Sequence, residues 1–314
     1  MPLARAVGER HLRRPWTLRQ RLEREGYLFI TPAYVVIAAV MIFPIIYSVW
    51  MSLNRVRLFG TSLLYHFVGL GNFRILIHAG VFWHSVIFTV SYAIITVFVE
   101  LFIGILLAVG VNHSIKRGRT VLLVMMIIPW TLVYAVSAQM WSYMFNGIYG
   151  IINFFFVSLG IVTQPVDWLG GPLLATLSIM VADVWKTTPF VAIILYAGLQ
   201  KIPLELYEAA AIDGAAGMIR FVRITFPLLR GSIAIAALFR VLQASGLFDL
   251  PFIMTAGGPG TSTESIAMLS WTTMFRDFQF GPGVSIAVFT IVVVVLVCVA
   301  FLALFRAQIG GHSE

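Results

Sequence analysis

Long runs of apolar residues, separated by short charged segments, recur along most of the chain. A helix needs about 20 consecutive apolar residues to cross the hydrocarbon core of a membrane. Residues 26–54 contain no charged residue, and residues 84–110 contain only Glu100. Only 11% of the 314 residues are charged, whereas soluble domains carry about 25%. The sequence therefore predicts an all-α polytopic membrane protein and excludes an ordinary soluble domain.

Six membrane-spanning helices account for these runs. The predicted spans cover residues 28–50, 84–110, 120–143, 172–198, 229–249 and 284–305. Residues 120–166 carry no charge over a length too great for one helix, so residues 146–161 are predicted to form a re-entrant or interfacial segment. The expected domain plan is a basic cytoplasmic segment (1–27), a six-span membrane domain (28–306) with an inner loop at 199–230, and a cytoplasmic tail (307–314).

The positions of Lys and Arg predict the orientation of the spans. With the N-terminus inside the cell, the inner segments hold fifteen Lys and Arg and the outer segments hold four. An excess of basic residues on the inner side is the usual arrangement in membrane proteins. We therefore expect a multi-pass membrane protein with both termini in the cytoplasm. The net charge of +8 gathers largely near the N-terminus, where we expect contact with anionic lipid and not with nucleic acid.

The inner loop at 199–230 has the sequence of a helical elbow. Pro203 is suited to open a helix, and residues 204–212 are good helix formers. Asp213 and Gly214 predict a turn, a second helix follows, and Pro227 is expected to begin the fifth span. Periodicity alone leaves two interpretations open: an amphipathic elbow that rests on lipid headgroups, or a docking element for another protein.

A spaced motif in this loop resembles a known family. Glu208, Ala209 and Ala210 are followed after three residues by Gly214, and after nine more by the sequence Ile-Thr-Phe-Pro, which ends at Pro227. This arrangement resembles the loop of permease subunits of binding-protein-dependent ABC importers. Phe226 stands where that family usually has leucine.

The resemblance implies a coupling helix that seats in a groove of a cytoplasmic ATPase. Glu208 would then face a basic group of the ATPase, Ala209 and Ala210 would allow close approach, and Asp213 and Gly214 would form the bend. ATP and Mg²⁺ are expected on the ATPase, since the sequence has no GxxxxGK[ST] phosphate loop and this chain needs no cofactor of its own. The expected partners are a second homologous permease, two ATPase subunits and an extracytoplasmic substrate-binding protein.

Four further stretches resemble the carbohydrate-importing branch of that family, of the maltose, trehalose and glycerol-phosphate type. They are FVGLGNFRIL, MWSYMFNGIYGIIN, VWKTTPF and TAGGPGTSTES. The last contains Gly257, Gly258 and Pro259 on the outer side, where a binding protein would dock. Without the resemblance these three residues indicate only a tight turn.

Four charged residues fall in the interior of the predicted spans, away from their ends: Glu100, Asp183, Lys186 and Arg240. Each costs about 2.5–3.5 kcal/mol at the centre of a membrane helix, so they must face water, a partner charge or the bundle interior. One interpretation is a buried ion pair of Asp183 with Lys186 or Arg240 that only fixes helix packing. The other is a polar pathway lined by the fourth and fifth spans.

The resemblance implies where such a pathway would contact sugar. The matching positions of carbohydrate permeases fall on Asp183, Thr187, Phe190, Arg240 and Gln243. Arg240 replaces a small polar residue of the maltose-type pattern, which favours a differently shaped or an anionic substrate.

Other functions remain as alternatives. An ABC permease for a non-sugar solute would share the elbow but should lack VWKTTPF and the Gly-Gly-Pro turn. An ion-coupled secondary transporter predicts internal repeats, and a membrane-embedded enzyme predicts clustered His or acidic ligands. The sequence shows neither feature, no metal-binding motif and no catalytic motif, so we expect no catalytic residue and no enzyme activity in this chain.

Overall fold

The computed structural model describes residues 18–59, 62–113, 116–215 and 217–310. Most of the predicted basic segment 1–27 and the end of the predicted tail 307–314 therefore lie outside the described residues. The chain divides into two compact units, Met1–Trp50 and Met51–Glu314, which are described separately.

The first unit is helical. Helix α1 (Leu18–Ile37) continues through a π turn (Ala38–Ile42) into α2 (Phe43–Ser52), whose last residues belong to the second unit. The π turn lies just before Pro44, which has no N–H to donate and would clash with a regular helix turn. Residues 25–52 form an apolar helix of span length, which contains the predicted first span 28–50.

A β-hairpin opens the second unit. Strand β1 (Asn54–Phe59) pairs antiparallel with β2 (Ser62–Phe67), so that Asn54 lies opposite Phe67. Helix α3 (Gly71–His78) follows, and its buried Asn72 donates from Nδ2 to the backbone oxygens of Ser52 at 2.8 Å and Asn54 at 2.9 Å. The prediction of an all-α fold did not include this hairpin, but helices make up the rest of the regular structure in the described residues.

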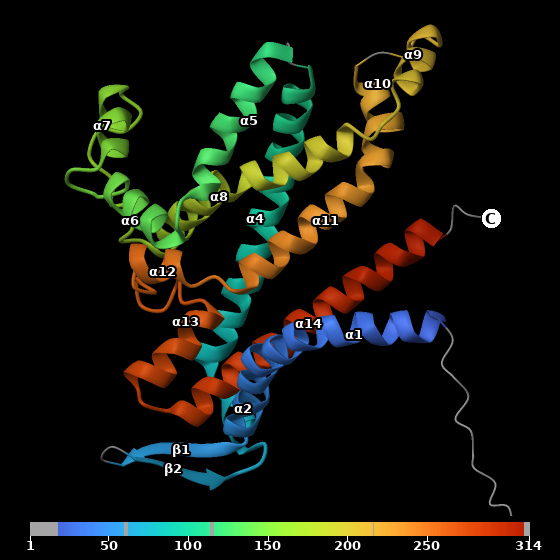
Figure 1. Ribbon diagram of the computed structural model, residues 1–314. Helices are drawn as coiled ribbons and strands as arrows, with labels where there is room; N and C mark the ends of the chain where they lie inside the picture. Colours follow the sequence, from blue (N-terminus) through green and yellow to red (C-terminus); the bar gives the residue numbers. More distant parts are fainter. Residues whose placement is uncertain (1–17, 60–61, 114–115, 216, 311–314) are drawn as a thin grey trace, which may run out of the picture. The chain divides into compact units, whose positions relative to one another are not determined.

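Three spans lie where the sequence predicted them. Helices α4 (Gly80–His113), α8 (Pro172–Leu199) and α14 (Phe280–Gly310) contain the predicted spans 84–110, 172–198 and 284–305 (Figure 1). Helix α4 has 34 residues, a length of about 51 Å at 1.5 Å per residue. This exceeds the roughly 30 Å of a hydrocarbon core, so part of α4 extends beyond it.

The helix of the fifth span begins and ends earlier than the predicted bounds 229–249. One helix runs from α10 (Met218–Arg220) through a π turn (Phe221–Thr225) into α11 (Phe226–Ser245). It ends at Ser245, and the chain then forms the short helices α12 (Asp249–Met254) and α13 (Ile266–Trp271) and a π turn (Thr272–Arg276) before α14. The mostly apolar composition of this stretch did not reveal the turn at 246–248.

The third span is broken, so the prediction of one helix at 120–143 is wrong. Helix α5 (Lys116–Thr131) and helix α6 (Tyr134–Met144) meet at an angle of 91°. Pro129 precedes the break and removes a backbone donor from the last turn of α5. Helix α7 (Ile151–Ser158) lies within the predicted re-entrant or interfacial segment 146–161. With the broken pair counted as one span, the described residues contain six candidate spans.

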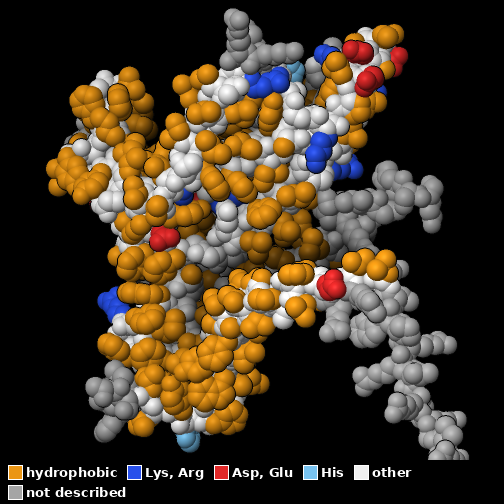
Figure 2. Space-filling view, in the orientation of Figure 1, with side chains coloured by type: hydrophobic (Ala, Val, Ile, Leu, Met, Phe, Trp, Pro, Cys, Tyr) orange, Lys and Arg blue, Asp and Glu red, His pale blue; other side chains and the backbone are white. Residues whose placement is uncertain are grey.

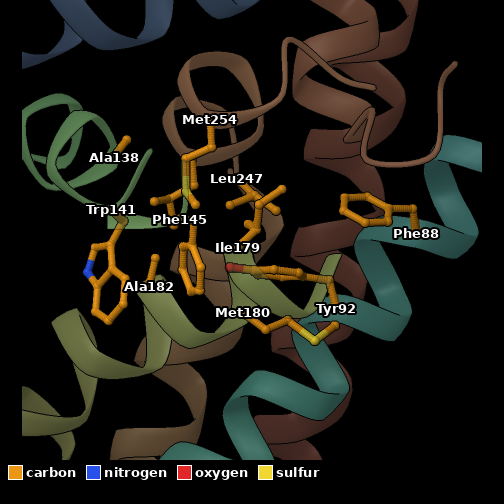
Figure 3. Packing of buried hydrophobic residues seen from close by; sticks show 11 residues of the cluster. Phe88, Tyr92, Ala138, Trp141, Phe145, Ile179, Met180, Ala182, Leu247 and Met254 are labelled. Atoms are coloured by element: carbon orange, nitrogen blue, oxygen red, sulfur yellow. The ribbon is translucent and has the colours of Figure 1, made fainter. Parts of the chain in front are cut away.

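Helix α8 packs against α4, α6, α11 and α12 in the interior of the second unit. One apolar cluster joins α4, α6, α8 and the segment 247–254, with Tyr92, Trp141 and Ile179 among its members (Figure 3). A second joins α4, α8 and α11 around Leu195 and Leu229. Outside these clusters apolar side chains cover much of the visible surface, as expected for helices that face lipid (Figure 2).

Two glycines allow α8 to approach its neighbours closely. A Cβ atom on Gly104 of α4 would lie 2.7 Å from Cγ1 of Val191, and one on Gly198 of α8 would lie 2.2 Å from Oγ of Ser232 in α11. Small residues at such crossings are typical of membrane helices. This close packing brings polar side chains of α4, α8 and α11 within hydrogen-bonding distance.

Candidate functional site: the elbow and the buried charge cluster

The elbow (residues 203–227) begins with helix α9 (Leu204–Ile212), which occupies the predicted range. A Schellman motif ends it: the N–H of Ala215 donates to the oxygen of Ala210 at 2.8 Å, and the N–H of Gly214 donates to that of Ala211 at 3.2 Å. Gly214 has a φ of +75°, which disfavours any side chain. The predicted turn at Asp213 and Gly214 is therefore confirmed, and its geometry explains the glycine.

The second half of the elbow differs from the prediction. It is the beginning of the long helix that contains α11, and not a separate helix, so the fifth span does not begin at Pro227. Pro227 is accommodated because the preceding turn widens, and the N–H of Phe226 donates to the oxygen of Phe221, five residues back. One side-chain hydrogen bond, 3.0 Å between the hydroxyl groups of Tyr207 and Thr225, joins the two halves.

Helix α9 has no buried residue. Glu208, Ala209, Asp213 and Gly214 are exposed, Ala210 and Pro227 are half-buried, and Ile212 is 88% exposed. Acidic side chains are visible over α9 (Figure 2). Helices of this length are marginal alone, because tertiary packing provides most helical stability. The elbow therefore presents an acidic and apolar helix that packs against little of its own chain.

A charge cluster joins α4, α8 and α11; it consists of the buried residues Glu100, Asp183, Thr187 and Arg240 and of the exposed Gln243. Arg240 is fully buried and binds both oxygens of Glu100, through Nε to Oε2 and through Nη2 to Oε1 at 2.7 Å. Nη2 also donates to Oδ2 of Asp183 at 3.0 Å. The guanidinium therefore bridges carboxylates from two different helices, a geometry that suits its planar fork of donors.

The two uncharged members complete the cluster. Nη1 of Arg240 donates to Oε1 of Gln243 at 2.8 Å, one turn along α11. The hydroxyl of Thr187 lies 2.7 Å from Oε1 of Glu100, to which it donates, and 2.7 Å from the backbone oxygen of Asp183. Every charged group thus has polar partners, which is the condition for keeping charges in a low-dielectric interior.

Lys186 does not pair with Asp183, which was one of the two pairs that the sequence left open. Its ammonium group donates to the backbone oxygens of Trp130, at 3.2 Å, and Leu132, and it lies 4.5 Å from the centre of the Tyr134 ring. These oxygens are at the break between α5 and α6, where the helix cannot satisfy its last carbonyl groups. A cation is favoured at this negative end of a helix. Lys186 therefore stabilises the broken span.

A cavity of about 160 Å³ lies beside the charge cluster. Its wall includes Asp183, Arg240 and Gln243 together with Tyr134 and Asp249. Thr187 and Phe190 are not part of this wall. Phe190 stacks on Trp130 with ring centres 5.4 Å apart and meets Phe239 edge-on at 6.0 Å. The structure thus gathers three of the five predicted sugar-facing residues around one cavity.

Sequence reasoning missed two residues here. Glu100 was recognised as a charge inside a span, but its distance along the sequence from Arg240 gave no indication that they pair. Asp249 was the last residue of the predicted fifth span, although it begins α12 and lines the cavity. Its position just after Ser245 and Gly246 was the available signal, since these residues end a helix. Among the described residues, no group of three or more His, Cys, Asp or Glu could hold a metal ion.

The Gly257 to Pro259 segment forms a turn, and Thr263 makes two of the hydrogen bonds that hold it. Thr263 is fully buried, its hydroxyl donates to the backbone oxygen of Gly258 at 2.9 Å, and its N–H donates to that of Gly257 at 3.1 Å. Gly257 has a φ of +83°, so this position requires glycine or strains another residue.

Comparison with known proteins relates this architecture to a family. The pattern of the family described as "Binding-protein-dependent transport system inner membrane component" matches residues 100–309. The chain belongs to this family. The match begins at Glu100 and includes the broken span, the elbow and the Gly-Gly-Pro turn, so these are features of a binding-protein-dependent transport component that crosses the membrane several times.

Three relatives of this transport component are named for the transport of trehalose, maltose or sulfoquinovosyl glycerol. The chain is 39% identical to the trehalose/maltose transport system permease protein MalF of Thermococcus litoralis over 92% of its own length and 96% of that protein. It is 34% identical to the sulfoquinovosyl glycerol transport system permease protein SmoG of Agrobacterium fabrum over 84% and 85%. It is 30% identical to the trehalose transport system permease protein SugA of Mycobacterium tuberculosis over 93% and 92%.

Among solved structures, the fold is similar to that of a chain from a bacterial alginate ABC transporter in complex with alginate pentasaccharide-bound periplasmic protein. The TM-score is 0.80 with 18% identity, over 93% of this chain and 98% of that one. At this identity the likeness concerns the fold.

Proposed function

We propose that this chain is the permease subunit of an ATP-driven carbohydrate importer and forms half of its substrate pathway. The observation that carries the proposal is the elbow: an exposed helix that bears the Glu208-Ala209-Ala210 motif and is ended by a glycine in a left-handed conformation. The chain packs little against this helix, which suits a surface that another protein covers. The names of the relatives support a carbohydrate as the cargo.

In this proposal the ATPase binds α9. Glu208 offers a carboxylate to a basic group, Ala209 and Ala210 allow close approach, and Asp213 and Gly214 hold the bend. ATP and Mg²⁺ belong to the two ATPase subunits, and this chain contributes no catalytic group. Because Pro227 lies within a helix that is continuous from Met218 to Ser245, a movement of the elbow is transmitted to the charge cluster along this one helix.

The pathway needs a second permease subunit. Complete ligand pockets usually measure about 300–1,000 Å³, whereas the cavity beside the charge cluster has about 160 Å³. A homologous chain facing it would enlarge the site. Asp183, Arg240 and Gln243 would contact the sugar directly, while Thr187 would hold Glu100 in place and Phe190 would support Trp130.

The charge cluster favours a neutral cargo over the anionic one that Arg240 suggested in the sequence. The single guanidinium is already bound by two carboxylates, so it offers no uncompensated positive charge to an anion. The polar wall supplies donors and acceptors suited to hydroxyl groups, and Tyr134 supplies an aromatic face.

The orientation follows from the basic residues, with both termini and the elbow on the cytoplasmic side of an inner membrane. The Gly257 to Pro259 turn then faces outward, where a substrate-binding protein docks. ATP-driven closure of the ATPases moves the elbow and opens the pathway outward, so the cargo passes by alternating access.

Reconstitution tests this function directly. The chain, its partner permease, the ATPase and the binding protein are assembled in proteoliposomes, and uptake of radiolabelled trehalose or maltose is measured. We expect uptake that requires internal ATP and the binding protein and that persists when ion gradients are collapsed. Uptake driven by an ion gradient without the ATPase would identify a secondary transporter instead. A binding protein stabilised by no sugar in a thermal-shift panel would favour a non-sugar permease.

A further inference from the structure

The elbow and the ends of two spans enclose a second, larger cavity, here called the elbow cavity. It measures about 710 Å³, within the usual range of ligand pockets. Its apolar wall comes from α4 and from the helix that follows the elbow turn, and includes Ile105, Leu106, Val109, Met218 and Phe221. Such a wall can accommodate a hydrocarbon chain.

The polar end of the elbow cavity is basic. Among the described residues of its wall, Arg220 and His113 are the basic side chains, and none is Asp or Glu. Arg220 is half-buried and makes no hydrogen bond or ion pair with any described residue. Arg119 adds a guanidinium nearby, since its Nη2 donates at 2.8 Å to the backbone oxygen of Asn112, which lines the cavity. The cavity therefore complements an anion.

The position of the cavity indicates the source of that anion. It lies at the C-terminal ends of α4 and α8, which a 2.7 Å hydrogen bond from Nε2 of Gln200 to Oδ1 of Asn112 holds together. The basic residues at 116–119 follow directly, as is usual where a span leaves the membrane. A phospholipid at this depth places its phosphate among basic side chains and its acyl chains along the spans.

The elbow cavity differs from the surface proposed for the ATPase. Glu208 and Asp213 do not line it, whereas Leu204 and Tyr207 of the same helix do. Helix α9 thus has one side toward the cavity and leaves its acidic motif outside. An occupant of the cavity would contact Leu204 and Tyr207 of α9 without covering the motif.

We propose that the elbow cavity binds one anionic phospholipid of the adjoining leaflet, with its phosphate on Arg220 and His113 and an acyl chain against Leu106 and Met218. The lipid fills the space under α9 and holds the elbow against the ends of α4 and α8. This binding does not depend on which solute the chain transports.

Native mass spectrometry of the purified chain tests the proposal, with dioleoyl phosphatidylglycerol as the anionic probe and dioleoyl phosphatidylcholine as the neutral one. Wild type should retain one phosphatidylglycerol and bind phosphatidylcholine at least about tenfold more weakly. Arg220→Gln should weaken phosphatidylglycerol binding roughly tenfold, because a charge-assisted bond to phosphate is lost. Arg223→Gln is the matched control, since Arg223 is exposed, on the same helix and outside the cavity wall, and it should bind like wild type.

A second variant tests the apolar wall. Leu106 lines the cavity and is 57% exposed, so Leu106→Trp should fill the space and reduce binding without unfolding the chain. Equal loss in Arg220→Gln and Arg223→Gln would mean that the lipid binds a diffuse basic surface, and the proposal would be wrong. Inorganic phosphate that displaces the lipid at millimolar concentration would show that the site does not require the acyl chain. Loss of the lipid on ATPase assembly would show that the ATPase fills the cavity instead. Either result overturns the proposal.

Discussion

Replacing Arg240 by methionine should strongly destabilise the membrane core. Arg240→Met keeps the volume of the apolar stem but removes four donors, two to Glu100 and one each to Asp183 and Gln243. Both carboxylates would then be buried without a cation. Removing one partner of a buried ion pair costs about 3–5 kcal/mol. Since 1 kcal/mol shifts Tm by about 2–4 °C in chains approaching this size, we expect a decrease of roughly 10 °C.

Thermal unfolding followed by tryptophan fluorescence in detergent measures this decrease. Arg230→Met is the control, because Arg230 lies on the same helix but is exposed, and its Tm should change by less than about 2 °C. The triple variant Arg240→Met, Glu100→Gln and Asp183→Asn removes the unpaired charges and should recover much of the loss. If Arg240→Met unfolds at the wild-type temperature, the cluster is not a structural ion network.

Three other substitutions test separate features. Gly214→Ala strains the left-handed turn by about 1–2 kcal/mol and should lower ATP-dependent uptake without lowering assembly of the transmembrane core. The control Gly231→Ala, in an open helical position, should leave uptake unchanged, and equal uptake in the two variants would contradict the role of the turn. Lys186→Met leaves the carbonyl groups at the break unpaired and should speed hydrogen exchange at 130–134, by a factor of about 10 for a loss of about 1–2 kcal/mol; unchanged exchange would contradict the capping role. Burial raises the pKa of Glu264, which lies outside the spans, although Thr272 donates to its carboxylate, so the stability of the chain should fall as pH rises from about 4.5 through the raised pKa. Glu264→Gln should have a higher Tm than wild type at pH 7.5 and lose this advantage near pH 4, and a Tm difference that does not change with pH would refute this reasoning.

Composition and charge placement predicted the membrane class and the approximate positions of the spans. These are properties of long segments, and a 28-residue helix such as α8 leaves little ambiguity. The elbow turn was also predictable, because Asp213 and Gly214 are local signals for a positive φ. The same local reasoning did not reveal the hairpin at 54–67, whose first residue, Asn54, accepts a hydrogen bond from Asn72 of α3.

Features that depend on distant contacts were less accessible. The break between α5 and α6 lies in a charge-free run, and it is stabilised by Lys186, which is more than fifty residues away in sequence. The pairing of Arg240 with both Glu100 and Asp183 depends on the packing of three helices, which Gly104 and Gly198 make close. Such pairings are set by tertiary structure, whereas the sequence of a single span indicates only that each charge must be compensated.

The central claim is that α9 is the contact surface for a separate ATPase. A photo-crosslinking amino acid placed at Ala209 tests it in cells that express the whole transporter, with the same group at Leu64 in the β-hairpin as the control, since both positions are exposed. We predict an adduct with an ATP-binding subunit from position 209 and none from position 64. Absence of the adduct at 209, or an equal adduct at 64, would contradict the assignment of the elbow as the docking element.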